Sequence, residues 1–262
     1  MVRFLSGLVQ LWRSLLGAIL FYTMLPLPKG VQPSFNRIAR WCPWVGVIIG
    51  SILLGVFWGL ESLNISALLR SAILVALWLG LTGGLHLDGA MDTADGLAVT
   101  EPKHRLAVMA DSVSGAFGVM AGILILLLKV TALESFGLET GYFLVVIPAW
   151  GRWSQVVAIA FYPYLKAEGK GAFHKQQFQL YPDLCWSICP MLLFLLLSYF
   201  VLPLSQWLSI LLSDLWFMTV AIAVSAWFGQ KFQGHTGDTY GATVEWTEVA
   251  CLISTALFTN GL

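Results

Sequence analysis

Residues 82–96 read Thr-Gly-Gly-Leu-His-Leu-Asp-Gly-Ala-Met-Asp-Thr-Ala-Asp-Gly and follow directly on an apolar run long enough to cross a bilayer. In this stretch Asp88, Asp92 and Asp95 stand at i, i+4 and i+7, which share one face of a helix of about 3.6 residues per turn. Three carboxylates on one face repel one another and are costly beside lipid. The spacing predicts an acidic helix face that binds a metal ion, with a solvated acidic helix end as the simpler alternative.

The composition is that of an integral membrane protein. Of the 262 residues, 58% are hydrophobic and only 11% are charged, whereas a soluble domain carries about 25% charged residues. The net charge is zero, so nothing indicates nucleic-acid binding. The four cysteines lie in or beside apolar runs and lack the partners of a zinc site, so we interpret them as free apolar side chains.

Seven segments qualify as membrane spans of about 20 mostly apolar residues: residues 41–60, 68–86, 113–133, 141–163, 184–204, 207–228 and 243–260. Before them, residues 1–25 form an apolar stretch that Arg13 interrupts and that ends before Pro26. We interpret it as an interfacial helix rather than a cleaved signal peptide. The expected fold is an all-α, polytopic helical bundle, a single membrane-embedded domain over residues 1–262, with about seven spans and an N-terminal interfacial helix.

Basic residues indicate the orientation. One set of alternate loops holds nine of them: Lys29, Arg37, Arg40, Lys103, Arg105, Lys166, Lys170, Lys175 and Lys231. The opposite loops and their flanks hold Arg70 and Lys129. Because cytoplasmic loops are enriched in Lys and Arg, the first set is expected in the cytoplasm, together with the acidic helix.

Two further polar segments lie on the same side, and one arginine lies within a predicted span. Asp111 precedes the third span, where it either faces the acidic helix across a hairpin or caps a helix. The loop 166–175 contains glycines and lysines that suit a phosphate or nucleotide, although such a loop is often only a solvated connection. Arg152 lies inside an apolar run and needs a partner, which is either an aspartate or a substrate.

The segment 234–242 contains Asp238 at the mouth of the last span. We expect Asp238 rather than Glu245 to contact a metal, because Glu245 falls inside the span and is interpreted as a capping or interhelical pair. The four histidines form no cluster of the kind that zinc requires. A site of oxygen ligands without thiolates favours Mg²⁺ or Mn²⁺.

These motifs together resemble the cobalamin synthase family, the adenosylcobinamide-GDP ribazoletransferases. The resemblance rests on Gly84–Gly89 with Asp92, Thr93, Asp95 and Gly96, on Met109–Gly118, on Glu168-Gly169, on Gly237-Asp238-Thr239 with Gly241, Ala242 and Glu245, and on the opening Phe21–Pro28. It covers almost the whole chain in the same order. One departure is Val113, where family members usually carry an arginine; Arg105, Arg152 or a lysine then supplies that charge, or it is not needed.

The resemblance implies a Mg²⁺-dependent enzyme of the cell inner membrane that joins α-ribazole, or its 5′-phosphate, to adenosylcobinamide-GDP and releases GMP. The expected metal ligands are Asp88, Asp92, Asp95, Asp111 and Asp238. One carboxylate is instead expected to take the proton of the attacking ribazole hydroxyl; Asp95 is favoured for this catalytic role, with Asp92 beside it. The implied substrate-binding residues are His86, Arg105, Arg152, Lys166, Glu168, Lys170, His174 and His235, with Lys166, Lys170 and His174 nearest the guanylate.

Two other functions are compatible with parts of the pattern. Asp92-x-x-Asp95-Gly96 is part of the motif of CDP-alcohol phosphotransferases, but no Ala-Arg follows it. A cation-coupled transporter would also place acids in a membrane, but it is expected to have paired interrupted helices in two related halves, which the sequence does not suggest. The partners expected are the two substrates and the lipid bilayer; a homo-oligomer is left open.

Overall fold

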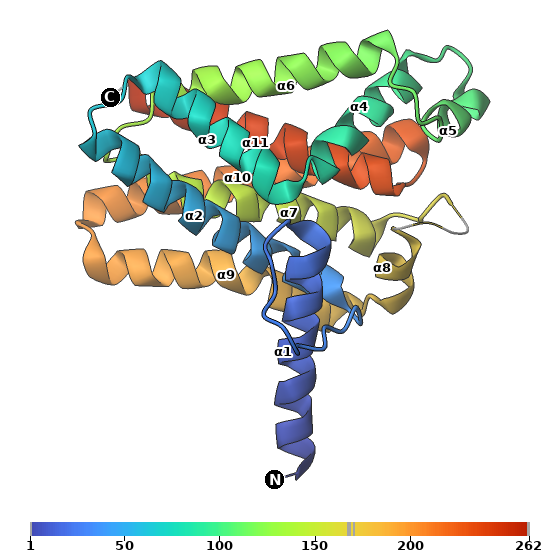
Figure 1. Ribbon diagram of the computed structural model, residues 1–262, viewed down its shortest axis with the longest axis horizontal. Helices are drawn as coiled ribbons and strands as arrows, with labels where there is room; N and C mark the ends of the chain where they lie inside the picture. Colours follow the sequence, from blue (N-terminus) through green and yellow to red (C-terminus); the bar gives the residue numbers. More distant parts are fainter. Residues whose placement is uncertain (1, 167–168, 170, 261–262) are drawn as a thin grey trace.

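The computed structural model describes residues 2–166, 169 and 171–260, which fold as a helical bundle (Figure 1). In chain order the elements are α1 (Val2–Tyr22), η1 (Ile38–Trp41), α2 (Cys42–Ser62), α3 (Ala67–Thr82), α4 (Leu85–Ala98), η2 (Pro102–His104), α5 (Arg105–Val108), α6 (Ala116–Glu134), α7 (Phe143–Phe161), α8 (Ala172–Gln177), α9 (Leu180–Val201), α10 (Leu204–Phe232) and α11 (Gly237–Asn260). The described residues form no β-strand. The all-α fold expected from the sequence is therefore confirmed.

Fewer helices than expected are apolar enough to cross a membrane by themselves. Among the described residues five segments qualify: Ile38–Ser62, α6, α7, α9 and α10. Helices α3 and α4 qualify only as a pair that bends by 91°. The count is thus five, or six with the bent pair, rather than seven, because α11 carries Glu245 and Glu248 in the segment predicted as the last span.

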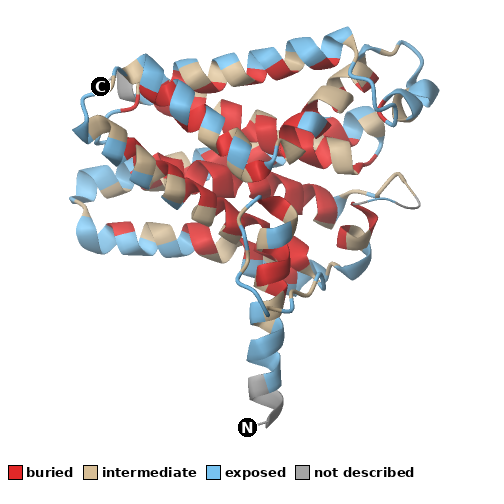
Figure 2. Cartoon of the chain, in the orientation of Figure 1, coloured by how far each residue is buried: buried red, intermediate tan, exposed pale blue. Residues whose placement is uncertain are grey.

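Helices α7 and α11 form the core of the bundle. Almost every residue of α7 is buried, whereas α9 exposes a row of leucines and aromatic rings. Helix α11 packs against α4, α6, α7 and α10, and buried residues concentrate along these central helices (Figure 2). A helix covered by protein on all sides has no lipid contact to satisfy, so α11 can carry polar residues that a lipid-facing span could not.

Glycines allow the closest helix pair to form. A Cβ built on Gly46 of α2 would lie 2.5 Å from Cα of Ala149 in α7, and one on Gly50 would collide with the carbonyl of Leu144. Only residues without a Cβ permit this backbone approach, as is common where helices associate in membranes.

Two consecutive glycines turn the chain at the end of α3. Gly83 and Gly84 both have left-handed backbone angles, with φ of 59° and 71°, a conformation that glycine adopts without the strain a Cβ causes. The chain therefore bends by 91° between α3 and α4.

Helix α1 also runs across the direction of the spans, and its N-terminal part extends beyond the bundle (Figure 1). Leu8, Val9, Trp12 and Leu20 on its surface are exposed, while Arg13 donates a hydrogen bond from Nε to the carbonyl of Gln32 at 2.7 Å. An amphipathic helix in this orientation fits the interfacial helix expected for residues 1–25.

Candidate active site

The acidic face predicted from residues 82–96 forms on α4, which spans Leu85–Ala98. This helix crosses the start of α11 at two glycines. A Cβ on Gly89 would lie 2.7 Å from the carbonyl oxygen of Asp238, and one on Gly241 would lie 2.8 Å from that of His86. The contact brings Asp238, in the first turn of α11, beside Asp88 and Asp92.

Asp92 has the most perturbed surroundings of these carboxylates. Asp92 is partly buried and lies among three like charges, those of Asp88, Asp238 and Asp95. In the described part of the chain neither Asp88 nor Asp92 accepts a hydrogen bond or pairs with a cation. The two side chains are therefore available to a cationic group that enters from outside.

Asp95 is engaged in holding the next helix. Its Oδ2 accepts the backbone N–H of Gly115 at 2.7 Å, and its Oδ1 accepts that of Gly118 at 2.8 Å. A Cβ on either glycine would collide with the carboxylate. Asp95 thus caps the N-terminus of α6, where a negative charge also interacts favourably with the helix dipole.

Asp111 closes a local turn before α6. It is exposed, and its Oδ1 accepts the backbone N–H of Val113 at 3.1 Å, which closes a local turn. Helix α6 begins later, at Ala116, after Gly115. Asp111 therefore does not cap α6, and it is not among the charges that act on Asp92.

Asp238 is paired with the loop that follows α7. Its Oδ2 accepts a hydrogen bond from Lys166 Nζ at 3.0 Å and another from Thr236 Oγ1 at 3.2 Å. Lys166 is thereby held at the acidic site, as its predicted role in substrate binding requires. Glu168 and Lys170, predicted in the same loop, lie outside the described residues.

A cavity of about 170 Å³ adjoins the acidic site between α1, α4, α7, α8 and α11. Asp88 and Asp238 line it together with His86, Gln155 and Tyr240. Both ring nitrogens of His86, Oε1 of Gln155 and the hydroxyl of Tyr240 are buried and have no hydrogen-bond partner among the described residues. Buried polar atoms are nearly always satisfied by protein, water or a ligand, so these four atoms mark the cavity as polar.

The other two predicted histidines, His174 and His235, both make internal contacts, and His174 also lines the cavity. His174 is buried, with Nε2 3.2 Å from the hydroxyl of Tyr22, and burial lowers its pKa to about 3. His235 is fully buried, 3.1 Å from Thr239 Oγ1 and 3.2 Å from the carbonyl of Ser225, and burial lowers its pKa to about 4. Both rings are neutral near pH 7, so neither supplies a charge to a phosphate, and His235 has no surface open to a substrate.

The two predicted arginines also make internal contacts. Arg105 donates from Nη1 to the carbonyl of Lys231 at 3.0 Å and lies over the ring of Phe232. Arg152 is fully buried and donates from Nη1 to Glu248 Oε1 at 2.9 Å and to the carbonyl of Pro148 at 3.0 Å. The partner of Arg152 is therefore a glutamate, not one of the aspartates, and the side chain is too enclosed for substrate contact.

Sequence reasoning missed a buried ion network of Lys129, Arg152, Glu245 and Glu248. Lys129 Nζ lies 2.7 Å from Glu245 Oε2 and 2.6 Å from Glu248 Oε2. From the sequence, Lys129 was expected to flank a loop on the side opposite the nine basic residues. In the structure Lys129 is buried between α6 and α11. The network could have been predicted from a lysine inside an apolar run together with two glutamates one helical turn apart. The interhelical pair expected for Glu245 is confirmed by its contact with Lys129.

The carboxylates do not form a closed metal site as they stand. Within the described ranges no three His, Cys, Asp or Glu side chains are close enough to share an ion. The oxygen-only donors of Asp88, Asp92 and Asp238 nevertheless suit a hard divalent cation in their chemistry. They come from two helices in direct contact, and two of the three have no partner.

Comparison with known proteins gives one family. The cobalamin-5-phosphate synthase family matches residues 14–256. An adenosylcobinamide-GDP ribazoletransferase of Thermosynechococcus vestitus is 52% identical over 94% of this chain and 96% of its own length. One of Synechocystis sp. is 51% identical over 92% and 93%, and one of Trichormus variabilis is 51% identical over 94% and 97%. No solved structure matches the chain.

Proposed function

The chain belongs to the cobalamin-5-phosphate synthase family, and from this premise we propose that it joins α-ribazole, or α-ribazole 5′-phosphate, to adenosylcobinamide-GDP. A ribose hydroxyl attacks the phosphorus attached to cobinamide, the bond to the GMP oxygen breaks, and the hydroxyl proton is lost to a base. GMP leaves, and adenosylcobalamin or its 5′-phosphate forms. The observation that carries the proposal is the contact at Gly89, which brings the acidic face of α4 against Asp238.

The metal of this reaction is proposed to be Mg²⁺, held by Asp88, Asp92 and Asp238. When bound, the cation would neutralise the charge of the diphosphate and the charge that develops on the leaving phosphate. If Asp238 holds the cation, its pairing with Lys166 would break, and the lysine would then be free to contact a phosphate oxygen. The engagement of Asp95 with α6 favours Asp92 over Asp95 as the group that takes the hydroxyl proton.

We assign the guanine base of adenosylcobinamide-GDP to the cavity beside the carboxylates. A corrin ring is far too large for about 170 Å³. The benzimidazole of α-ribazole offers one free ring nitrogen and would leave most of the polar atoms unpaired. Guanine presents N–H donors at N1 and N2 and an acceptor at O6, which match the acceptor Oε1 of Gln155 and the donors and acceptors of His86 and Tyr240.

The location is proposed to be the cell inner membrane, with the active site facing the cytoplasm. The apolar helices support a multi-pass membrane protein, and the bias of nine basic residues against two supports the orientation. Lys129 belongs to neither side, because it is buried in the bundle, so the bias is larger than the sequence count suggested. Arg70 lies at the opposite end, where it pairs with Glu61 and donates to the carbonyl of Phe136.

The alternative of a coupled transporter has less support. Such folds place two interrupted helices in corresponding halves, and the described helices contain one bent pair, α3 with α4. In addition, the acidic face of α4 lies at one end of the bundle, where α4 turns away from α3, whereas a coupled transporter binds its substrate near the middle of the spans.

A cell-free assay tests the proposed reaction. Protein purified in detergent receives adenosylcobinamide-GDP, α-ribazole and Mg²⁺, and released GMP is measured. GMP is expected only when both substrates are present; EDTA abolishes its release and excess Mg²⁺ restores it. An absence of GMP across detergents, added lipids and divalent metals would overturn the proposal.

A further inference from the structure

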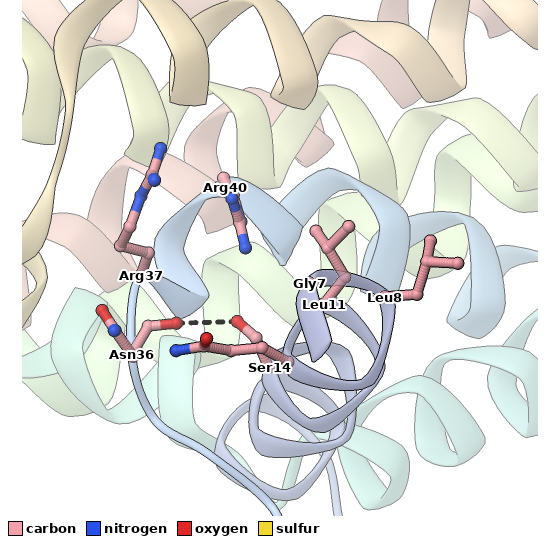
Figure 3. A pocket seen from close by; sticks show the side chains of 8 residues that line it. Gly7, Leu8, Leu11, Ser14, Asn36, Arg37 and Arg40 are labelled. Carbon is pink, nitrogen blue, oxygen red and sulfur yellow. Dashed lines mark hydrogen bonds between the residues drawn. The ribbon is translucent and has the colours of Figure 1, made fainter. Parts of the chain in front are cut away.

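A second cavity, of about 490 Å³, lies between α1 and the start of η1, away from the candidate active site. Its walls differ in character (Figure 3). Leu8 and Leu11 of α1 form an apolar wall, whereas Arg37 and Arg40 form a cationic one, and Ser14 and Asn36 close the floor. Ser14 Oγ donates to the carbonyl of Asn36 at 2.7 Å and accepts a hydrogen bond from Trp41 Nε1 at 3.1 Å, which fixes α1 to η1.

The cationic wall carries more positive charge than its partners neutralise. Arg37 donates from Nε and Nη2 to both oxygens of the buried Asp183. Arg40 reaches the same carboxylate only at 3.9 Å, beyond hydrogen-bond distance, and its Nε has no partner in the described structure. Two guanidiniums therefore share one carboxylate, and the wall keeps a positive charge with unused N–H donors.

The surroundings of the cavity are of the kind found at the level of lipid headgroups. Helix α1 runs across the spans and exposes Trp12 and other apolar side chains. Trp41, Trp44 and Trp186 pack together at the same end of the bundle, with ring centroids 5.2 to 6.2 Å apart. Interfacial helices and tryptophans of this kind mark the boundary between acyl chains and headgroups.

We propose that this cavity binds an anionic phospholipid, with its phosphate on Arg40 and Arg37 and its acyl chains against Leu8 and Leu11. Arginine presents planar N–H pairs that match phosphate oxygens, and Arg40 has such donors unused. The apolar wall opposite the arginines favours a lipid over free phosphate or a nucleotide, which would leave those leucines uncovered. Binding would anchor α1, whose last residues Phe21 and Tyr22 line the cavity of the candidate active site.

Native mass spectrometry of the purified protein tests the site. The protein is exchanged into vesicles of phosphatidylcholine alone, or of equal parts phosphatidylcholine and phosphatidylglycerol, and then released into mild detergent. The wild type is expected to retain phosphatidylglycerol in preference to phosphatidylcholine. Arg40→Gln is expected to weaken that retention by about tenfold or more, because it removes a charged donor. Lys29→Gln, which removes an exposed charge outside the cavity, serves as the matched control.

A second variant separates lipid binding from a folding defect and from phosphate binding. Leu8 is half exposed, so Leu8→Asn is expected to fold and to lose lipid retention through the apolar wall. Inorganic phosphate is added as a competitor and is expected not to displace the lipid. Equal retention by wild type and both variants, retention of the two lipids without preference, or displacement by phosphate would each overturn the proposal.

Discussion

Asp92 is the carboxylate on which the proposed chemistry depends most directly. It accepts no hydrogen bond from the described chain and lies among three like charges. Asp92→Asn therefore removes a proposed metal ligand, while the asparagine keeps the shape of the side chain and relieves the repulsion. Release of GMP is expected to fall by about two orders of magnitude or more, whereas the thermal unfolding temperature stays the same or rises. Glu101→Gln, which removes an exposed charge that pairs only with its exposed neighbours Lys103 and His104 in the described structure, is the control. A variant with wild-type turnover would remove Asp92 from the site.

Tyr240 tests the assignment of guanine to the cavity. Its hydroxyl is buried without a partner among the described residues, so Tyr240→Phe breaks no contact within the protein and is expected to fold normally. If the hydroxyl binds guanine, inhibition by GMP weakens by about tenfold, and the preference for GMP over AMP narrows. Tyr199→Phe, on the exposed surface of α9, is the control. If Tyr240→Phe still releases GMP and the inhibition constants of GMP and AMP are unchanged, guanine binds elsewhere, and the transferase proposal itself still stands.

The burial of His174 leads us to expect a fold that loses stability in acid. Its folded pKa is about 3 because of burial, against about 6.5 in an unfolded chain. Below pH 6.5 the unfolded chain therefore binds a proton that the folded chain does not, and stability falls as the pH drops toward 3. Near pH 4 this loss is about 3 kcal/mol. His174→Gln is expected to unfold with a shallower pH dependence across this window, whereas His104→Gln, on an exposed side chain, is expected to keep the wild-type slope. Identical slopes in both variants would contradict the prediction.

At the scale of helices, the approach of α4 to α11 is the feature that assembles the site. A Cβ on Gly89 would lie 2.7 Å from the carbonyl oxygen and 3.0 Å from Cα of Asp238, and backbone atoms cannot move aside as a flexible side chain can. Gly89→Ala is expected to separate the helices, to destabilise the protein by about 1–3 kcal/mol, and to reduce turnover.

The control for this prediction is Gly59→Ala in α2. A Cβ at Gly59 meets no atom within 4 Å, so alanine is expected to be neutral or to stabilise the helix by about 0.5–1 kcal/mol. Thermal unfolding and GMP release of the two variants are compared. If Gly89→Ala matches Gly59→Ala in both measurements, the close approach does not matter to the site.

The helices themselves were largely predictable from sequence, and the exceptions have a common cause. Apolar length located α2, α6, α7, α9 and α10, and the aspartate spacing located α4. Residues 243–260 were predicted as a membrane span because they are mostly apolar, but the helix they form, α11, is covered by neighbouring helices. A linear sequence records how apolar a helix is, and does not record whether protein or lipid covers it.

At the scale of the whole molecule, the acidic face was predictable and the cavity beside it was not. Asp88, Asp92 and Asp95 are close in sequence, so helical geometry alone places them together. The residues of the cavity come from five helices, and Tyr22, Gln155 and Tyr240 stand far apart in the chain. Only tertiary packing brings them together, and the same holds for the pairing of Arg37 with Asp183 across 146 positions. Asp95 and Asp111 were predicted as metal ligands from the motifs. Their hydrogen bonds to backbone N–H groups depend on the fold and could not be predicted from the sequence.

The buried ion network joins α6, α7 and α11 and gives a prediction about the integrity of the whole bundle. Two cations and two carboxylates balance there, and Lys129 contacts both glutamates. Lys129→Met fills the space but leaves two carboxylates to the single charge of Arg152. Removal of one partner from a buried pair is costly, so a loss of about 3–5 kcal/mol is expected.

Adding Glu245→Gln to Lys129→Met restores the charge balance, because one carboxylate then remains for Arg152. The double variant is expected to recover a substantial part of the stability, measured by thermal unfolding and by the fraction that elutes as a single species in detergent. This recovery distinguishes charge balance from packing, since the double variant is no better packed than the single one. If the two are equally unstable, the network stabilises the bundle through its shape, and its charges could be replaced by apolar residues.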